Sequence, residues 1–330
     1  MIPFLCLLQE ALKKGRNRMK KCFAKNNSFF AGLRKELQRN WILYLMIVPV
    51  LVYFIIFSYV PMYGVTLAFK KYNAKLGILG SPWVGLKYFQ RFFTAYNFEQ
   101  LLTNTFTISI YYLLVSFPLS IIFALCLNYV TNKPLKKTVQ MVSYAPHFLS
   151  TVVLCSMVTL FMHKDTGIFN TLRNLVGLES VQFLAKPEWF KSIYVWSGVW
   201  QHMGFDSIIY ISALAGVDYQ MHEAAIIDGA TKIQRMRYVD LPSIKPTIIM
   251  LLILKIGGLA NVGFEKVFLL QNDLNKSASA IISTYTYEVG LINSDYSYST
   301  AIGLFNTIIN IVLLVSANAI CKKVTDESLF

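Results

Sequence analysis

Two residues of opposite charge, Asp206 and Lys255, each lie within a long apolar segment of the sequence. An ionisable side chain is costly inside a membrane, so it usually faces a cavity or a partner of opposite charge. Asp206 lies about ten residues before the end of one apolar segment, and Lys255 about nine residues after the start of the next. At ~1.5 Å of rise per helical residue, both lie ~15 Å deep. An ion pair that braces the two segments is therefore one hypothesis, and separate contact of each charge with a hydrated pathway is the other.

No motif for catalysis or cofactor binding accompanies these charges. The sequence has no GxxxxGKS/T phosphate loop, no GxSxG elbow and no HExxH pair. The four histidines lack the spacing of metal ligands; they are His147, His163, His202 and His222. We therefore expect a chain that is not an enzyme and binds no cofactor or metal. If ATP powers the protein, another polypeptide must hydrolyse it.

The composition is typical of a membrane protein. Apolar and aromatic residues make up 55% of the 330 residues and charged residues only 15%, whereas a soluble domain carries about 25% charged residues. Charge-free stretches of about 20 residues are long enough to cross a bilayer as a helix. We expect an all-α, polytopic protein with six transmembrane helices at residues 41–60, 104–130, 139–162, 192–216, 246–264 and 301–321.

The basic residues predict the orientation of these helices. A formal net charge of +14 would also suit a nucleic-acid-binding protein, but the basic residues flank apolar segments instead of forming one solvated face. Ten of the 31 Lys and Arg residues precede residue 41, which marks that side as cytoplasmic. Six spans then place both termini in the cytoplasm. The expected parts are a basic tail at 1–40, a membrane domain at 41–321, a tail at 322–330, and outward loops at 61–103, 163–191 and 265–300.

The predicted cytoplasmic segment 217–245 begins with a short helix that ends at a glycine. Asp218 precedes the helix-forming run Met221–Ile227. Gly229 then allows the chain to turn away into a second helix. Two short helices that meet in this way form a compact knob outside the membrane, and such a knob suits a cleft in a partner protein.

The second half of this segment leaves an alternative open. Thr231–Val239 is expected to form the second helix, with Pro242 and Pro246 stopping it before the next span. Arg235 and Arg237 on this helix would also suffice to hold an amphipathic helix on anionic lipid. The residues by themselves favour the knob and the lipid-bound helix about equally.

The same segment resembles a known motif. Its residues Glu223-Ala224-Ala225, Asp228-Gly229-Ala230 and Leu241-Pro242 are similar to the EAA loop of ABC importer inner-membrane permeases. The flanking sequences resemble the carbohydrate branch of that family, and within it the LplB-like permeases for complex sugars. These flanks are Ile208–Leu214, Gly263-Phe264-Glu265, Phe268–Leu270, Asn318 and Glu327–Phe330.

The resemblance implies a type I ABC importer permease fold in a bacterial cell membrane. Its implied partners are a second permease subunit, two cytoplasmic ATPase subunits that hold ATP and Mg, and an extracytoplasmic binding protein, in that family a lipoprotein, that delivers a carbohydrate. The implied contacts with the ATPase come from Glu223, Ala224, Ala225, Asp228, Gly229, Ala230, Leu241 and Pro242. Tyr219, Ile233 and Met236 depart from residues frequent in the family, so the detailed fit to the ATPase stays open.

Sugar recognition usually needs aromatic rings and amide or carboxylate groups. The candidates in the outer and middle parts of the last three spans are Trp196, Trp200, Gln201, Asn261, Glu265 and Asn306. The two tryptophans are four residues apart, a spacing that also suits anchoring at the membrane boundary. A secondary transporter or channel without an ATPase is the alternative function, although it leaves the EAA-like loop unexplained. A membrane-embedded enzyme would need a reactive cluster, which the sequence lacks.

Overall fold

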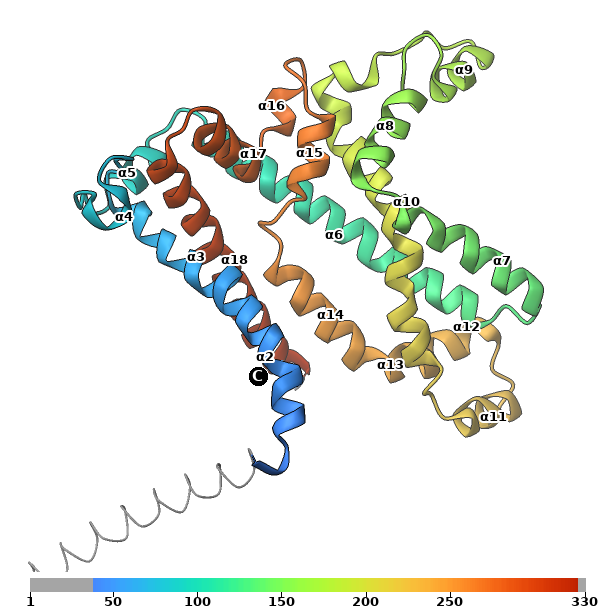
Figure 1. The fold of residues 1–330 in the computed structure, drawn as a ribbon. Helices are drawn as coiled ribbons and strands as arrows, with labels where there is room; N and C mark the ends of the chain where they lie inside the picture. Colours follow the sequence, from blue (N-terminus) through green and yellow to red (C-terminus); the bar gives the residue numbers. More distant parts are fainter. Residues whose placement is uncertain (1–37, 326–330) are drawn as a thin grey trace, which may run out of the picture. The chain divides into compact units, whose positions relative to one another are not determined.

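The computed structural model describes residues 38–325, which contain helices and turns and no β-strand apart from one isolated bridge between Lys70 and Trp83 (Figure 1). The chain divides between Val65 and Thr66 into two units, which we describe separately. Residues 1–37 of the expected basic tail and residues 326–330 of the expected carboxyl-terminal tail lie outside the described residues.

The first unit contains an apolar helical run that continues into the second unit. It consists of α2 (Trp41–Phe54), a π-helical turn (Ile55–Tyr59) and α3 (Val60–Met62), and helical turns continue to Phe69. Pro61 follows the π-helical turn. A proline removes one backbone donor and its ring clashes with the carbonyl four residues earlier. The wider turn before Pro61 accommodates this clash without ending the helix.

Two long helices form the centre of the second unit. α6 (Phe98–Asn128) packs against α10 (Pro187–Leu214), and Figure 1 shows the two helices crossing. Phe117 and Ala124 of α6 contact the same apolar cluster as Tyr210 and Leu214 of α10. A second apolar cluster joins both helices to α8 (Thr151–Phe161) and α15 (Phe264–Leu270). The packing of these apolar faces fixes the positions of the polar side chains between them.

The predicted third span is not one straight helix. The chain forms α7 (Lys133–Tyr144), a 3₁₀ turn (Ala145–Phe148) and then α8, with a bend of 104° between the two parts. Pro146 lies in the turn, and Ser150 has an extended backbone and accepts a hydrogen bond from Val153 N. The serine therefore starts a new helix in a new direction, which the uninterrupted apolar pattern of 139–162 did not reveal.

The predicted fifth span also differs. α14 (Lys245–Gly257) has 13 residues, so at ~1.5 Å per residue it covers ~20 Å, less than the ~30 Å thickness of a bilayer core. Residues 258–263 are not helical and α15 follows. The span predicted at 246–264 is therefore wrong beyond Gly257, because apolar residues continue through a segment in which the helix has ended.

The last helix and the loop helices complete the second unit. α18 (Tyr296–Thr325) packs against α14, α5 (Lys87–Phe93) and α17 (Ile282–Tyr287). The remaining helices of this unit, which belong mostly to the loops, are α4 (Gly77–Gly80), α9 (Ile168–Leu175), α11 (Tyr219–Ile227), α12 (Lys232–Arg235), α13 (Leu241–Ser243) and α16 (Lys276–Ser279). Within residues 38–325, three helices are long and apolar enough to span a membrane, or four if the bent α7–α8 pair is one span. The predicted count of six is not confirmed, although the all-α membrane architecture is.

Candidate coupling surface and polar pocket

The loop 217–245 forms a helical knob at one end of α10 and α14 (Figure 1). Asp218 caps α11, because its side chain accepts a hydrogen bond from Gln220 N. α11 ends at Ile227, and its C-cap Asp228 is followed by Gly229 at φ +74°. Gly229 N donates to Ile226 O at 3.0 Å, and Ala230 N donates to Ala225 O at 2.8 Å. This pair of bonds is a Schellman motif, which needs the left-handed backbone that glycine adopts without strain.

The chain re-enters a helix directly after this turn. Thr231 and Gln234 form a capping box at the start of α12, in which Thr231 Oγ1 accepts from Gln234 N and Gln234 Oε1 accepts from Thr231 N. A π-helical turn (Met236–Asp240) then leads into α13, and only Ile244 separates α13 from α14. The prediction that Pro242 stops the helix is wrong, because the wide turn before the proline relieves its clash.

Asp240 fastens the knob to the rest of the second unit. Its side chain is fully buried, and Tyr129, the residue after α6, donates its hydroxyl to Asp240 Oδ2 at 2.7 Å. On the other oxygen, His222 Nε2 of α11 lies 3.2 Å from Asp240 Oδ1. Burial and the bond to Asp240 raise the pKa of the Tyr129 hydroxyl, so it stays a hydrogen-bond donor at neutral pH. α11 and the end of α6 therefore meet at one carboxylate, which accepts a hydrogen bond from Tyr129 and can form an ion pair with protonated His222.

The outer surface of the knob mixes apolar and acidic side chains. Glu223, Ala224, Asp228 and Gly229 are exposed, while Ala225 and Ala230 are half-buried. Apolar side chains on the same knob are also exposed, Tyr219, Met221, Ile226, Ile227, Ile233, Tyr238 and Leu241 among them. Pro242 is exposed as well. The apolar residues of α11 do not gather along one face, which is unlike an amphipathic helix lying on lipid.

Inside the second unit, Asp206 of α10 and Lys255 of α14 lie side by side. Lys255 Nζ donates to Asp206 Oδ2 at 2.6 Å. Both side chains are partly exposed and contribute to a small pocket between α6, α10 and α14. Breaking a half-buried pair leaves an uncompensated charge in an apolar environment, which makes each residue depend on the other.

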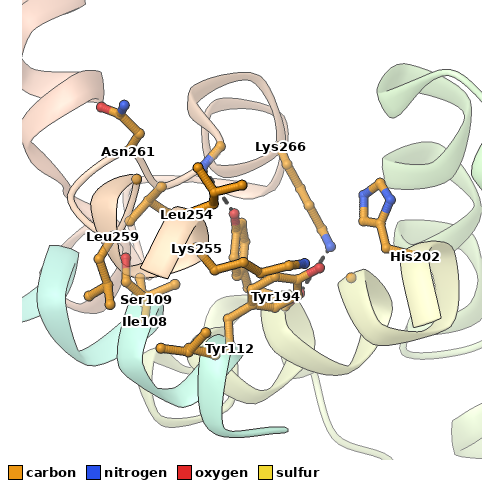
Figure 2. A pocket seen from close by; sticks show the side chains of 15 residues that line it. Ile108, Ser109, Tyr112, Tyr194, His202, Leu254, Lys255, Leu259, Asn261 and Lys266 are labelled. Atoms are coloured by element: carbon orange, nitrogen blue, oxygen red, sulfur yellow. Dashed lines mark hydrogen bonds between the residues drawn. The ribbon is translucent and has the colours of Figure 1, made fainter. Parts of the chain in front are cut away.

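A larger polar pocket adjoins this pair at the place where α14 ends. It has a volume of about 370 Å³ and is lined by α6, α10, α14, the non-helical segment 258–263 and α15. Figure 2 shows the lining side chains, with dashed lines marking the hydrogen bonds that Tyr194 accepts from Lys266 and Gly263. Non-helical backbone at membrane depth is tolerated where it is buried in protein or lines a hydrated cavity. The segment 258–263 meets this condition, because it lines the pocket.

Side chains from distant parts of the chain form hydrogen bonds with polar groups of the non-helical segment. The amide of Ala260 donates to Asn310 Oδ1 at 3.0 Å, and the amide of Gly263 donates to the Tyr194 hydroxyl at 3.2 Å. Asn261 Oδ1 accepts from Nδ2 of both Asn306 and Asn310, at 3.1 and 3.0 Å. The polar groups freed by the helix break are thus paired with α10 and α18.

Residues 116–326 match the model of the family described as binding-protein-dependent transport system inner membrane component. This range covers more than half of the chain. The chain belongs to this family.

The curated relatives of this permease include sugar transport subunits. It is 43% identical to Protein LplB of Bacillus subtilis over 306 residues, which cover 93% of this chain and 95% of the relative. It is also 43% identical to the polygalacturonan/rhamnogalacturonan transport system permease protein YteP of the same bacterium, with 90% and 92% covered. A solved chain of a bacterial ABC transporter involved in the import of the acidic polysaccharide alginate has a TM-score of 0.83 and 38% identity, with 89% of the permease and 99% of that chain covered.

The structure distributes the predicted sugar-binding residues of the permease among different surroundings. Asn261 lines the 370 Å³ pocket and contacts Asn306. Trp196 and Trp200 instead line a separate apolar pocket with Phe161 and Trp189. The two other candidates are elsewhere: Gln201 is buried and donates to Leu149 O at 3.4 Å, and Glu265 is exposed. The predicted set therefore does not form one site.

Sequence reasoning missed several residues of the permease. Tyr112, Tyr194 and Lys266 line the pocket, and Asp240 anchors the knob. The buried residues Lys266, Val267 and Leu270 recur at helical spacing, which is a signal that the lysine lies on an inward face. Nothing comparable marks the two tyrosines, because aromatic residues are frequent throughout this sequence.

Proposed function

We propose that this permease forms one half of the transmembrane pathway of an ATP-driven importer for carbohydrates. A second permease subunit supplies the other half, two cytoplasmic ATPase subunits hydrolyse ATP with Mg, and an extracytoplasmic binding protein delivers an oligosaccharide. Two relatives support this proposal, because YteP and the alginate transporter are both named as transporters of polysaccharides. A related solved structure contains the alginate transporter together with an alginate pentasaccharide-bound periplasmic protein.

The observation that carries this proposal is the knob 217–245. Its exposed Tyr219, Met221, Arg237 and Tyr238 are of the residue types that are enriched at protein interfaces. Its two helix caps and the Asp240 anchor make it stiff. In our proposal Glu223, Ala224, Ala225, Asp228, Gly229, Ala230, Leu241 and Pro242 occupy the cleft of one ATPase subunit.

Transport then follows from a two-state equilibrium. When ATP draws the two ATPase subunits together, a stiff knob held in each of them must move, and the helices continuous with it, α10 and α14, move with it. ATP must favour one arrangement of the pathway over the other, since a ligand without differential affinity shifts nothing. The Asp206–Lys255 pair links these two helices directly. In this scheme both termini and the knob are cytoplasmic, and no cofactor or metal binds to the permease itself.

Purification of the tagged permease from membranes tests this proposal. An ATPase, a second permease and a binding protein should copurify, and the reconstituted complex should hydrolyse ATP faster when the binding protein carries its sugar. Recovery of the permease as a lone homo-oligomer that transports without ATP would support a channel or secondary transporter and reject the proposal.

A further inference from the structure

Lys266 is a buried cation without an acidic partner. Lys266 is only 8% exposed. Among residues 38–325, no carboxylate lies within ion-pair distance of its ammonium group. The ammonium donates one hydrogen bond, to Tyr194 O at 2.9 Å. It also lies 4.8 Å from the centroid of the Tyr194 ring. A lysine has three donors, so two of them are available toward the pocket.

Another buried lysine shows what a structural role looks like in this chain. Lys70 is 4% exposed, and its ammonium donates to two backbone carbonyls, Ile78 O at 2.9 Å and Leu79 O at 3.1 Å. Lys70 lines none of the pockets described above, whereas Lys266 lines the 370 Å³ pocket. An ionised side chain in a membrane protein usually faces a partner or a pathway, and Lys266 faces the pocket.

The charges around the pocket leave it with one net positive charge. Lys255 also lines the pocket, but Asp206 neutralises it. Glu265, next to Lys266 in sequence, is exposed and does not line the pocket. Of the remaining polar groups of the lining, the Tyr112 hydroxyl and the Asn261 amide are neutral, and the His202 ring can only add positive charge.

The pocket has room for a ligand directly beside the ammonium. Gly198 of α10 lines it, and a Cβ atom at this position would lie 2.8 Å from Tyr112 Cε2 and 3.1 Å from Lys266 Nζ. The absence of a side chain there keeps the tyrosine ring and the ammonium accessible from the same side. A volume of about 370 Å³ falls within the range of about 300–1,000 Å³ that is usual for small-molecule sites.

We propose that Lys266 binds the carboxylate of an acidic sugar residue in this pocket, so that the substrate of the permease is an anionic oligosaccharide. This inference rests on the proposed carbohydrate importer. A carboxylate forms charge-assisted hydrogen bonds with the two free donors of the ammonium. Tyr112 offers an aromatic face to the sugar ring, and Asn261 offers donors and acceptors to hydroxyls.

The test measures the binding of acidic and neutral trisaccharides to the assembled transporter without its binding protein. The probes are trigalacturonate and a trisaccharide of alginate, each compared with its carboxyl-reduced neutral form. The wild-type complex should bind at least one acidic probe about ten- to a hundred-fold more tightly than the neutral form, as expected for a hydrogen bond to a charged group. Lys266→Gln should abolish this ratio, and Lys266→Arg should retain most of it.

The matched control is Lys276→Gln. Lys276 is an exposed lysine ten residues further along the chain that pairs with Glu288 and does not line the pocket, so this change should leave the ratio unaltered. Equal binding of acidic and neutral probes by the wild type would overturn the inference. If Lys266→Gln weakened the binding of acidic and neutral probes equally, the inference would also be overturned, since that result indicates a structural role for Lys266. Copurification of the ATPase in the same sample tests the importer separately.

Discussion

The knob 217–245 and the polar pocket at the end of α14 are built in opposite ways. The knob is formed by one continuous stretch of chain with local signals: Asp218 caps one helix, Gly229 ends it, and Thr231 caps the next. The pocket is assembled from four helices and the segment 258–263, and its lining residues extend from Ile108 to Lys266 in the sequence. A surface such as the one that we propose to dock the ATPase can therefore be encoded locally, whereas an internal pocket depends on the packing of the whole unit.

The largest expected effect concerns Asp240, through which the knob depends on a residue distant in sequence. Asp240→Ala removes the carboxylate that Tyr129 and His222 share. A buried donor left without its acceptor costs about 1–3 kcal/mol, so the ATPase should copurify poorly and transport should fall by up to about a hundred-fold. Asp240→Asn, which keeps an acceptor for Tyr129, should lose less. Normal copurification of Asp240→Ala would contradict the anchoring role.

Gly229→Ala tests the local part of the knob. A left-handed backbone costs a residue with a Cβ about 1–2 kcal/mol, so we expect transport to fall by about ten-fold. The control is Gly177→Ala, because Gly177 has a similar φ of +77° and equally free surroundings but lies outside the knob. Similar losses of ATP-driven transport in both variants would show that strain alone, and not the position of the knob, causes the defect.

The Asp206–Lys255 pair links α10 and α14, the two helices that adjoin the knob and also line the polar pocket. Asp206→Ala should lower transport several-fold, and the additional change Lys255→Met should partly restore it, because interacting residues show coupling energies of about 0.5–3 kcal/mol. Transport by the four proteins of this double-mutant cycle is the measurement. Two losses that simply add would reject a brace and favour separate contact of each charge with a hydrated pathway.

The smallest expected effects show which of two pockets contacts the sugar, the polar pocket or the pocket lined by Trp196 and Trp200. Asn261→Ala removes the acceptor of two asparagine amides and should weaken sugar uptake about two- to five-fold, as for a loss of about 0.5–1 kcal/mol. Trp200→Leu should leave uptake within about two-fold, since its ring lies in the other pocket and is 44% exposed. The reverse order of effects would place the sugar against Trp196 and Trp200.

The helix termini of the knob could be predicted because they depend on residue types close together in sequence. Asp218, Gly229 and Thr231 each act on amides or carbonyls within five positions of themselves. The break after Gly257 could not be predicted in this way. Its freed amides bond to Tyr194 and Asn310, and hydropathy reports neither contact. Hydropathy consequently places Lys266 in the predicted outward loop 265–300, although the structure buries it beside α10.

The central claim, that the knob is held by a separate ATPase, can be tested by photo-crosslinking from Ile227, whose side chain is 85% exposed. A benzophenone amino acid at this position should form an adduct with the ATPase subunit in intact membranes, and the yield should change when ATP binds. The same probe at Leu175 of α9, which is 79% exposed, should form none. An active transporter in which the probe at Ile227 reacts only with lipid would contradict the account.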